Sequence, residues 1–333
     1  MKVTIMANST IEQEQDFQQR ADPYRRELLA HCYRMLGSIH DAEDLVQETY
    51  LRAWRSYGGF EGRSSLRTWL YRIATNCCLT AIDQRGHRPL PSGLGAPNGE
   101  PERPVVAAPE VPWLEPAPDA ALAGDAADPA TIVATRERTR LAFVAALQHL
   151  PPNQRVVLIL RDVLKWRAAE VAELLETSTA SVNSALQRAR AQLRQAAPEE
   201  DAMVEPADPG QRRLLERYAT LFERADIAGL VELFKEDAVW EMPPFPEWFV
   251  GRGTIARLIV AQCDPEPGEL RLVPTAANGQ PAFGLYRRGE DGVHRPYQIQ
   301  VLTVTGEGIA RGSVFFDPSL FPLFGLPETL PPA

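Results

Sequence analysis

Cysteine is scarce in this sequence, with four residues in a chain of 333. Cys32, Cys77, Cys78 and Cys263 form neither a CxxC pair nor a Cys/His cluster with zinc spacing. A disulfide framework and a zinc-binding module are therefore both excluded. This cysteine usage is typical of the reducing cytoplasm, and we expect no metal ion and no cofactor.

Long hydrophobic runs are also missing. No apolar stretch approaches the roughly 20 residues that cross a bilayer, which excludes an integral membrane protein. The first residues, MKVTIMANSTIEQEQDF, become polar and acidic after six positions and lack the apolar stretch and cleavage site of a secretory signal. We therefore expect a cytoplasmic protein without a membrane partner.

The net charge of −9 is distributed unevenly along the chain. Residues 20–88 and 132–195 carry net charges of +3 and +5, whereas residues 89–131 and 196–333 carry −6 and −9. A basic excess confined to two short segments of an acidic chain is typical of modules that bind a polyanion.

Ten prolines fall within residues 89–131, where apolar periodicity is almost absent. Proline fixes φ and removes a backbone donor, so we interpret this stretch as an extended acidic linker that forms no packed element. A second break follows at residues 196–210. The predicted organisation is a polar tail at 1–19, a helical domain at 20–88, the linker at 89–131, a helical domain at 132–195 and a third domain at 210–333.

Both basic segments have helical periodicity. In the first, apolar residues three and four positions apart predict a helix ending at Gly37, a second over 40–57 and a third over 66–85. In the second segment, helices are predicted over 136–150, 151–164, 167–176 and 179–195.

The last two of these helices form a candidate helix-turn-helix, because the connection between them, Glu176–Thr177–Ser178, is short. Short polar and arginine side chains follow the outer face of the second helix, where they can read base edges and hold phosphates in a major groove. These side chains are Ser181, Asn183, Ser184, Gln187, Arg188 and Arg190. Taken alone, an ordinary helical hairpin with a polar outer face explains this pattern equally well.

Two segments together resemble the sigma2 and sigma4 domains of the extracytoplasmic-function sigma factors of bacterial RNA polymerase. They are MLGSIHDAEDLVQETYLRAWRSYGGFEGRSSLRTWLYRIATNCCLTAIDQR at 35–85 and LPPNQRVVLILRDVLKWRAAEVAELLETSTASVNSALQRARAQLR at 150–194. They occur in the family's order with an acidic linker between them, and cover somewhat under half of the chain. The resemblance implies two all-α domains, a sigma2 helical bundle and a sigma4 helix-turn-helix.

The resemblance also implies partners and roles. The partners are promoter DNA and the RNA polymerase core, which the family contacts through the β′ clamp helices and the β flap. The family's helix that docks on the clamp corresponds in this sequence to the segment with Asp41, Asp44, Gln47 and Glu48. Without the resemblance, these four residues form an ordinary solvated acidic face. The family's promoter-melting region matches Phe60, Arg63, Ser64, Ser65, Arg67, Trp69, Asn76 and Arg85. The linker of the family threads through the polymerase near the nascent RNA.

The last third of the chain resembles the SnoaL-like branch of the nuclear-transport-factor-2-like superfamily. Its predicted order is two helices, a strand, a helix and four strands, and the segment FKEDAVWEMPPFPEWFVGR carries the resemblance. This implies an α+β domain with a curved sheet around a conical pocket. The expected pocket residues are Trp240, Glu241, Met242, Trp248, Phe249 and Tyr286. A carboxylate such as Glu241 in an apolar pocket would have a raised pKa and could act as a base.

We therefore expect a sigma factor that directs promoter-specific initiation, has no catalytic residues of its own and is regulated in cis by the SnoaL-like domain. A small unidentified ligand is a candidate partner of that domain. The alternative is a SnoaL-like cyclase or isomerase fused to a DNA-binding region. A conventional helix-turn-helix repressor would need only 132–195 and leaves 20–88 unexplained. The apolar tail from Ser319 is expected to pack on the third domain or on the sigma domains.

Overall fold

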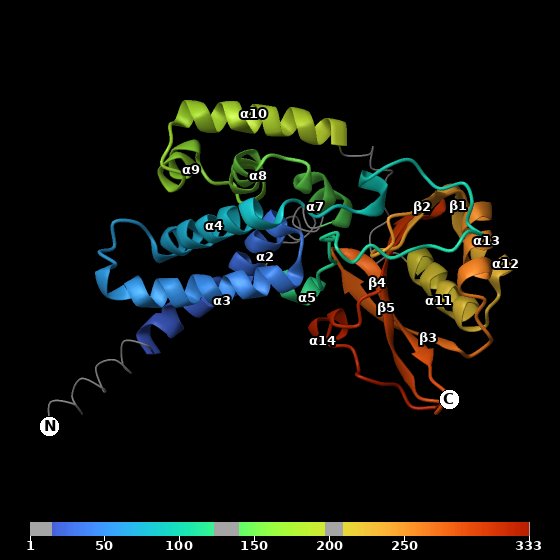
Figure 1. The fold of residues 1–333 in the computed structure, drawn as a ribbon. Helices are drawn as coiled ribbons and strands as arrows, with labels where there is room; N and C mark the ends of the chain where they lie inside the picture. Colours follow the sequence, from blue (N-terminus) through green and yellow to red (C-terminus); the bar gives the residue numbers. More distant parts are fainter. Residues whose placement is uncertain (1–14, 123–139, 197–208, 333) are drawn as a thin grey trace, which may run out of the picture. The chain divides into compact units, whose positions relative to one another are not determined.

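The computed structural model describes residues 15–122, 140–196 and 209–332, which belong to two compact units (Figure 1). The N-terminal unit comprises Met1–His87 and Ala121–Ala197, and the C-terminal unit comprises Arg88–Ala120 and Pro198–Ala333. The chain thus leaves the first unit, enters the second, returns to the first and then completes the second.

The first helical group of the N-terminal unit follows the predicted pattern. Its elements are η1 (Asp22–Tyr24), α2 (Arg25–Leu36), α3 (Ile39–Ser56), η2 (Tyr57–Gly59) and α4 (Leu66–Arg85). Helix α2 ends at Gly37, whose φ of 71° is easily adopted by glycine alone. Ser38 then begins α3, because its hydroxyl accepts the backbone N–H of Asp41 over 3.0 Å. The three predicted helices of this segment are confirmed, with the second beginning and ending one residue earlier than predicted.

The second helical group contains the predicted helix-turn-helix. Its elements are α7 (Leu141–Gln148), α8 (Pro152–Leu158), the π-helical turn η4 (Ile159–Val163), α9 (Ala168–Leu174) and α10 (Thr179–Ala196). The hydroxyl of Ser178 accepts the N–H of Ser181 over 3.1 Å and so starts α10. Val182, Leu186 and Ala189 bury one side of α10. The expected helix over 136–150 is present from Leu141 onward, and residues 136–139 lie outside the described residues.

A buried arginine joins the two helical groups. Arg155 of α8 is 1% exposed and donates to the carbonyl of Met35 at the end of α2. The same guanidinium donates to the side chain and the carbonyl of Gln148, both at 2.9 Å. Burial lowers the pKa of Arg155 to about 10. The surrounding oxygen atoms satisfy Nη1 and Nη2, whereas the buried Nε has no hydrogen-bond partner in the structure.

The C-terminal unit is built on a six-stranded sheet in the order β2-β1-β6-β5-β4-β3. The strands are β1 (Phe234–Glu241), β2 (Trp248–Val250), β3 (Leu270–Ala277), β4 (Gln280–Arg288), β5 (His294–Thr305) and β6 (Gly308–Phe315). Strands β1 and β6 are parallel and all other pairs are antiparallel. The helices are α11 (Pro209–Glu223), α12 (Ile227–Val231), α13 (Arg252–Gln262) and α14 (Leu320–Leu323). The expected all-α segments and the α+β third domain are thus present.

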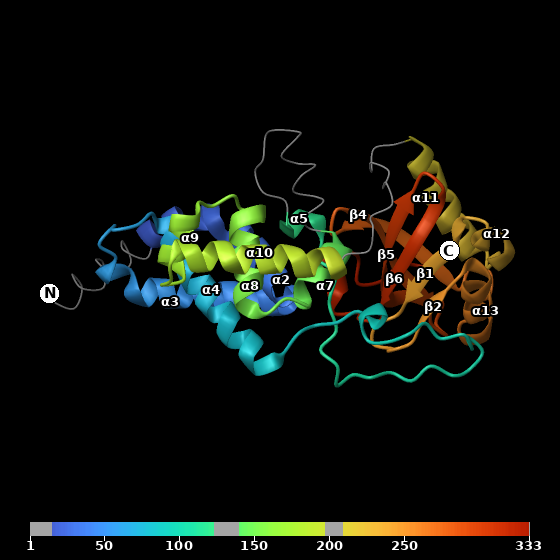
Figure 2. The same cartoon turned by 90° about the horizontal axis from the view of Figure 1, so that it is seen from above.

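Helices α11, α12 and α13 cover one face of this sheet and enclose the apolar core, with Tyr218, Trp240 and Phe249 among its buried side chains (Figure 2). Along each strand, alternate residues point to the opposite face. That second face is also covered, because the tail packs on it: Phe321 meets the ring of Tyr286, and Leu330 pairs with His294. The expected packing of the tail on the third domain is confirmed.

The expectation of an unpacked linker is wrong for Arg88–Ala120, which belongs to the C-terminal unit. In Figure 2 this segment, drawn in teal, passes β2 and α13. Its contacts include backbone hydrogen bonds, such as Asn98 N–H to the carbonyl of Trp248 at 2.7 Å and Ala108 N–H to that of Pro244 at 2.8 Å, and side-chain bonds, such as Gln262 to the carbonyl of Arg103 at 2.8 Å. Prolines keep most of this segment out of helix and sheet, apart from the 3-10 turn η3 (Pro91–Gly93) and the start of α5 (Asp119–Leu122), and leave the remaining amides free to bond to another surface. Of the rest of the predicted linker, residues 123–131 lie outside the described residues.

No helix in the described ranges is long and apolar enough to cross a bilayer. Within the same ranges, no three His, Cys, Asp or Glu side chains gather where they could hold a metal ion. Cys32, Cys77 and Cys78 are buried free thiols, and Cys263 is an exposed one.

Candidate functional sites

The outer face of α3 carries the predicted polymerase-docking residues. Asp44 and Gln47 are exposed. Glu48 is paired with Arg52 at 2.6 Å, and Asp41 is paired with Arg85 at the end of α4. The face therefore contains an exposed carboxylate at its centre and carboxylates with intramolecular partners on both sides.

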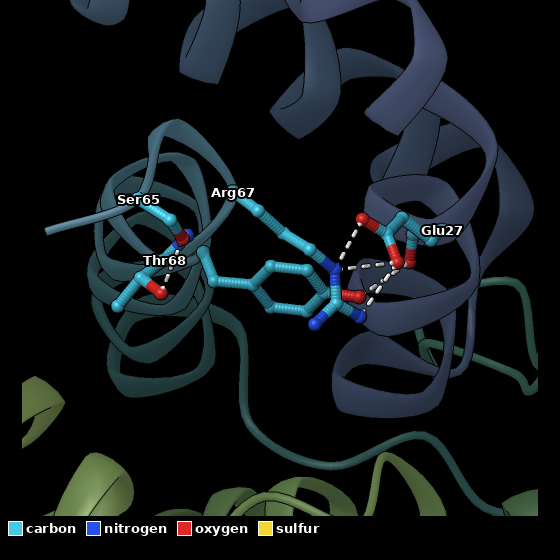
Figure 3. A network of polar contacts seen from close by, with 5 residues as sticks. Glu27, Ser65, Arg67 and Thr68 are labelled. Carbon is cyan, nitrogen blue, oxygen red and sulfur yellow. Dashed lines mark hydrogen bonds and ion pairs between the residues drawn. The ribbon is translucent and has the colours of Figure 1, made fainter.

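Arg67, a predicted melting residue, is held within the N-terminal unit (Figure 3). Its Nε and Nη2 donate to the carboxylate of Glu27 on α2, each with a shortest distance of 2.7 Å. This hydrogen bonding raises the pKa of Arg67. The guanidinium also lies 5.0 Å from the ring centre of Tyr71 and 5.6 Å from that of Trp166. Arg67 is thus a structural link between α2, α4 and the segment that precedes α9.

The other predicted melting residues divide into exposed and structural ones. Phe60 packs on Trp69 with ring centres 4.9 Å apart, so these two aromatics form a half-buried pair. Ser65 starts α4 by accepting the N–H of Thr68 over 3.1 Å (Figure 3). Arg63 and Asn76 are exposed, whereas Ser64 is partly buried. The exposed members and the Phe60–Trp69 pair are the side chains that nucleic acid can reach.

All six predicted recognition residues of α10 are exposed, but the two arginines differ. Arg188 donates to the hydroxyl of Ser184 over 3.0 Å. Arg190 makes a two-pronged ion pair with Asp162, at 2.8 and 2.6 Å, which raises its pKa. Arg188 is therefore the arginine that faces outward with a weak partner, while Arg190 fixes α10 to η4.

A cleft of about 490 Å³ brings predicted residues of both helical groups together. Asn76 of α4 lies on one wall, and Ser181 and Arg188 of α10 lie on the other. Arg72 of α4 also contacts the carbonyl of Glu173 on α9 over 3.4 Å. Glu27, Trp166 and Arg155 hold this arrangement together, and the sequence did not reveal them. The reason is that their partners are at least 40 positions away or on the other helical group.

The C-terminal unit contains a small apolar cavity of about 40 Å³ between α13 and the inner face of the sheet. Two of the six predicted pocket residues, Trp240 and Met242, line it. The further lining residues are Phe222, Leu258, Ile259, Gln262, Cys263, Pro265, Glu269, Leu270, Arg287, Tyr297, Gln298, Val314 and Phe316.

Glu241 lies on the opposite face of β1, so its prediction as a base inside the apolar pocket is wrong. Its side chain is fully buried and is paired with Arg311 at 3.0 Å. It also accepts the hydroxyl of Ser313 over 2.8 Å and the backbone N–H of Ser92 over 3.3 Å. Strand alternation explains the error, because Trp240 and Met242 point into the cavity and the residue between them cannot.

The remaining three predicted pocket residues have structural contacts instead. Trp248 donates its indole N–H to the carbonyl of Gly95 over 2.9 Å, and Phe249 is buried in the core. Tyr286 donates its hydroxyl to the carbonyl of Pro327 over 2.8 Å, and burial raises its pKa to about 12. Trp248 therefore holds the linker, Phe249 packs in the core, and Tyr286 holds the tail.

Family models match three segments of the chain. Sigma-70 region 2 matches residues 21–88, Sigma-70 region 4 matches residues 140–193, and the SnoaL-like domain matches residues 215–311. The first two cover α3, α4 and all but the last residues of α10.

The sequence is similar to those of known sigma factors over most of its length. It is 56% identical over 321 residues to the ECF RNA polymerase sigma factor SigG of Mycobacterium tuberculosis strain H37Rv, covering 96% of this chain and 86% of that protein. It is 29% identical to SigJ of the same strain over 65% of this chain and 61% of that protein. The crystal structure of M. tuberculosis SigJ shares the fold with a TM-score of 0.57 and 24% identity, over 91% of this chain and 97% of that chain.

Proposed function

Since this chain belongs to the extracytoplasmic-function RNA polymerase sigma factors and so directs promoter-specific transcription initiation, we propose how its two units divide the work. In the cytoplasm, α3 binds the β′ clamp helices of the core polymerase. Helices α4 and α10 bind promoter DNA, with the second helical group also contacting the β flap. The C-terminal unit regulates these steps in cis and has no catalytic role.

The docking role of α3 rests on its exposed acidic face. Asp44 lies on the outer side of the helix, and Val46 and Thr49 bury the inner side. A carboxylate face of this kind favours rapid association with a basic partner. Because the inner face alone carries the packing of α3, charge can be reversed on the outer face without opening the core.

The DNA-binding role rests on α10 and on the exposed part of the melting region. Arg188, Asn183 and Gln187 lie on one exposed face, where their donors and acceptors can meet base edges. The Phe60–Trp69 pair can stack on an unpaired base, and Arg63 and Asn76 add exposed polar groups to the same region of the sequence.

The regulatory role rests on the capture of Arg88–Ala120 by the C-terminal unit. The carboxylate of Glu241 binds Ser92 N–H, and Arg311 donates to the hydroxyl of Ser92 over 3.3 Å. Farther along, Ala117 N–H donates to Asn278 over 2.9 Å, and Asn278 N–H donates back to Ala117 over 3.0 Å. A unit that holds both ends of the segment between the sigma domains can set how that segment is placed on polymerase.

The enzymatic alternative has less support. Among the described residues that line the cavity, the two charged side chains, Glu269 and Arg287, are paired with each other at 2.7 Å. Glu241, the expected base, is neutralised by Arg311. The cavity thus offers no unpaired carboxylate among its described lining residues, which favours regulation over catalysis.

Binding to purified core polymerase tests the docking proposal. We expect Asp44→Lys combined with Glu48→Lys to abolish co-elution with the core enzyme and run-off transcription. The matched control reverses two exposed acidic residues of the C-terminal unit, Glu232→Lys with Glu290→Lys, and leaves both readouts intact. Full core affinity in the α3 double variant would refute the docking role.

Run-off transcription also tests the regulatory proposal. A chain that ends at Pro206 lacks the surface that holds Arg88–Ala120, so we expect its transcript yield to differ from that of the full-length chain on the same promoters. Equal yields from several promoters would contradict regulation in cis while leaving the sigma-factor activity itself intact.

A further inference from the structure

The cavity of the C-terminal unit has an apolar wall with one unsatisfied polar atom. Trp240, Met242, Leu258 and Phe316 are among the side chains that line it. Gln298 of β5 also lines it, is 6% exposed, and its Oε1 has no hydrogen-bond partner in the structure. A buried amide oxygen without a donor costs stability, so such atoms mark places where a ligand or water binds.

The polar side chains at the outer part of the cavity carry no uncompensated charge. Arg287 is paired with Glu269 and also stacks on Tyr297, with 5.5 Å between the guanidinium and the ring centre. A charged ligand would lose its hydration without gaining a counter-charge here. The wall therefore favours a neutral ligand.

The volume restricts the size of the enclosed group. A cavity of about 40 Å³ holds about three water-sized groups, since one such group needs roughly 10–15 Å³ by this measure. Cys263 is exposed, so the cavity reaches the surface on the α13 side, and a larger molecule could extend outward there.

We infer that this cavity binds a neutral aliphatic alcohol, or the short hydroxylated end of a larger neutral molecule, whose hydroxyl donates to Gln298 Oε1. The carbon atoms of the ligand contact Trp240, Met242 and Leu258, and the hydroxyl supplies the donor that the amide oxygen lacks. Glu241, which holds Ser92, points to the other face of β1, whereas Gln262 lines the cavity and donates to the carbonyls of Pro101 and Arg103 over 3.0 and 2.8 Å, so the site borders one part of the surface that holds Arg88–Ala120.

Binding of 2-fluoroethanol to the full-length chain, followed by its ¹⁹F NMR signal, tests this inference. This probe has four non-hydrogen atoms and a single hydroxyl. We expect saturable broadening that excess propan-1-ol reverses. Gln298→Leu removes the acceptor and should weaken binding about fivefold, the equivalent of one hydrogen bond. Met242→Phe should abolish binding by filling the cavity.

Thermal unfolding separates a ligand-binding glutamine from a structural one. The control is Gln280→Leu, because Gln280 is also a buried glutamine of the sheet but donates to Thr303 over 2.9 Å. We expect Gln280→Leu to lower the melting temperature and to leave the dissociation constant of the probe unchanged. Gln298→Leu should unfold at the wild-type temperature or above it. Absence of saturable binding to the wild-type chain, or unchanged binding to Met242→Phe, would overturn the inference, and neither result bears on core-polymerase binding.

Discussion

Ser92 donates its backbone N–H to the buried carboxylate of Glu241 over 3.3 Å, although 149 positions separate the two residues in the sequence. Glu241 is also the partner of Arg311, which in turn donates to the hydroxyl of Ser92. The proline-rich segment is thus bound by an ion pair that belongs to β1 and β6. Stability of the C-terminal unit and placement of the segment are therefore coupled.

Glu241→Gln should lower the stability of the C-terminal unit and weaken its hold on the proline-rich segment. Removing one member of a buried ion pair leaves the other charge without compensation, so we expect the free energy of unfolding to fall by about 3 kcal/mol. Hydrogen exchange in residues 90–118 should also accelerate. Glu236→Gln is the control, because Glu236 lies on the same strand but pairs with Arg252 at the exposed surface. Equal exchange in both variants would show that Glu241 does not hold the segment.

Arg188→Ala and Arg190→Ala should affect promoter binding differently. Arg188 faces outward, so its loss should weaken binding of the upstream element by about 1–3 kcal/mol if it contacts a base. Arg190 is paired with Asp162, and its loss should mainly increase hydrogen exchange at the contact between α10 and η4. Fluorescence anisotropy with a labelled promoter duplex and a base-substituted duplex measures the first effect. A larger loss of base discrimination in Arg190→Ala would reverse these assignments.

Gly37→Ala should destabilise the N-terminal unit for two reasons. Its φ of 71° costs about 1–2 kcal/mol for a residue with a Cβ. A Cβ would also lie 3.1 Å from Cδ of Gln148, so the side chain that binds Arg155 would have to move. Gly62→Ala has a similar φ of 70° but nothing within 4 Å of the new Cβ. Urea denaturation should show a greater loss for Gly37→Ala, and equal losses would exclude a contribution from Gln148.

His31 should make the stability of the N-terminal unit depend on pH. Burial, with a smaller contribution from Arg34, lowers the pKa of His31 to about 3. The unfolded chain takes up this proton below pH 6.5 and the folded chain does not, so stability falls as the pH drops from 6.5 toward 3. Between pH 7 and pH 5 the loss amounts to about 2 kcal/mol from this group.

The variant that isolates this effect is His31→Gln, which does not titrate and can still bond to Thr75, now 3.0 Å from His31 Nε2. Hydrogen exchange of the amides of α2 and α4 at the two pH values, corrected for intrinsic exchange rates, measures the difference. The same pH dependence in both proteins would mean that another group causes it.

The sequence alone determined the helical domains, their order and the curved-sheet domain, because these depend on local periodicity and on caps such as Gly37 and Ser38. It also placed Arg188 and Asp44 on outer faces, since a helix has a fixed period. Tertiary structure decided the partners of these helices. Arg67 meets Glu27 and Trp166, and Arg155 meets Met35, across distances in sequence that no period encodes.

The proline-rich segment and Glu241 show the same division more sharply. Composition correctly excluded helix and sheet from most of Arg88–Ala120 but could not reveal that its free amides bond to the C-terminal unit, because their acceptors lie on distant strands. The pattern around Glu241 identified a strand, yet a shift of one residue decides which face a side chain joins. The pairing of β1 with β6 and the covering of one side by helices decided which face lines the cavity and which face holds the segment.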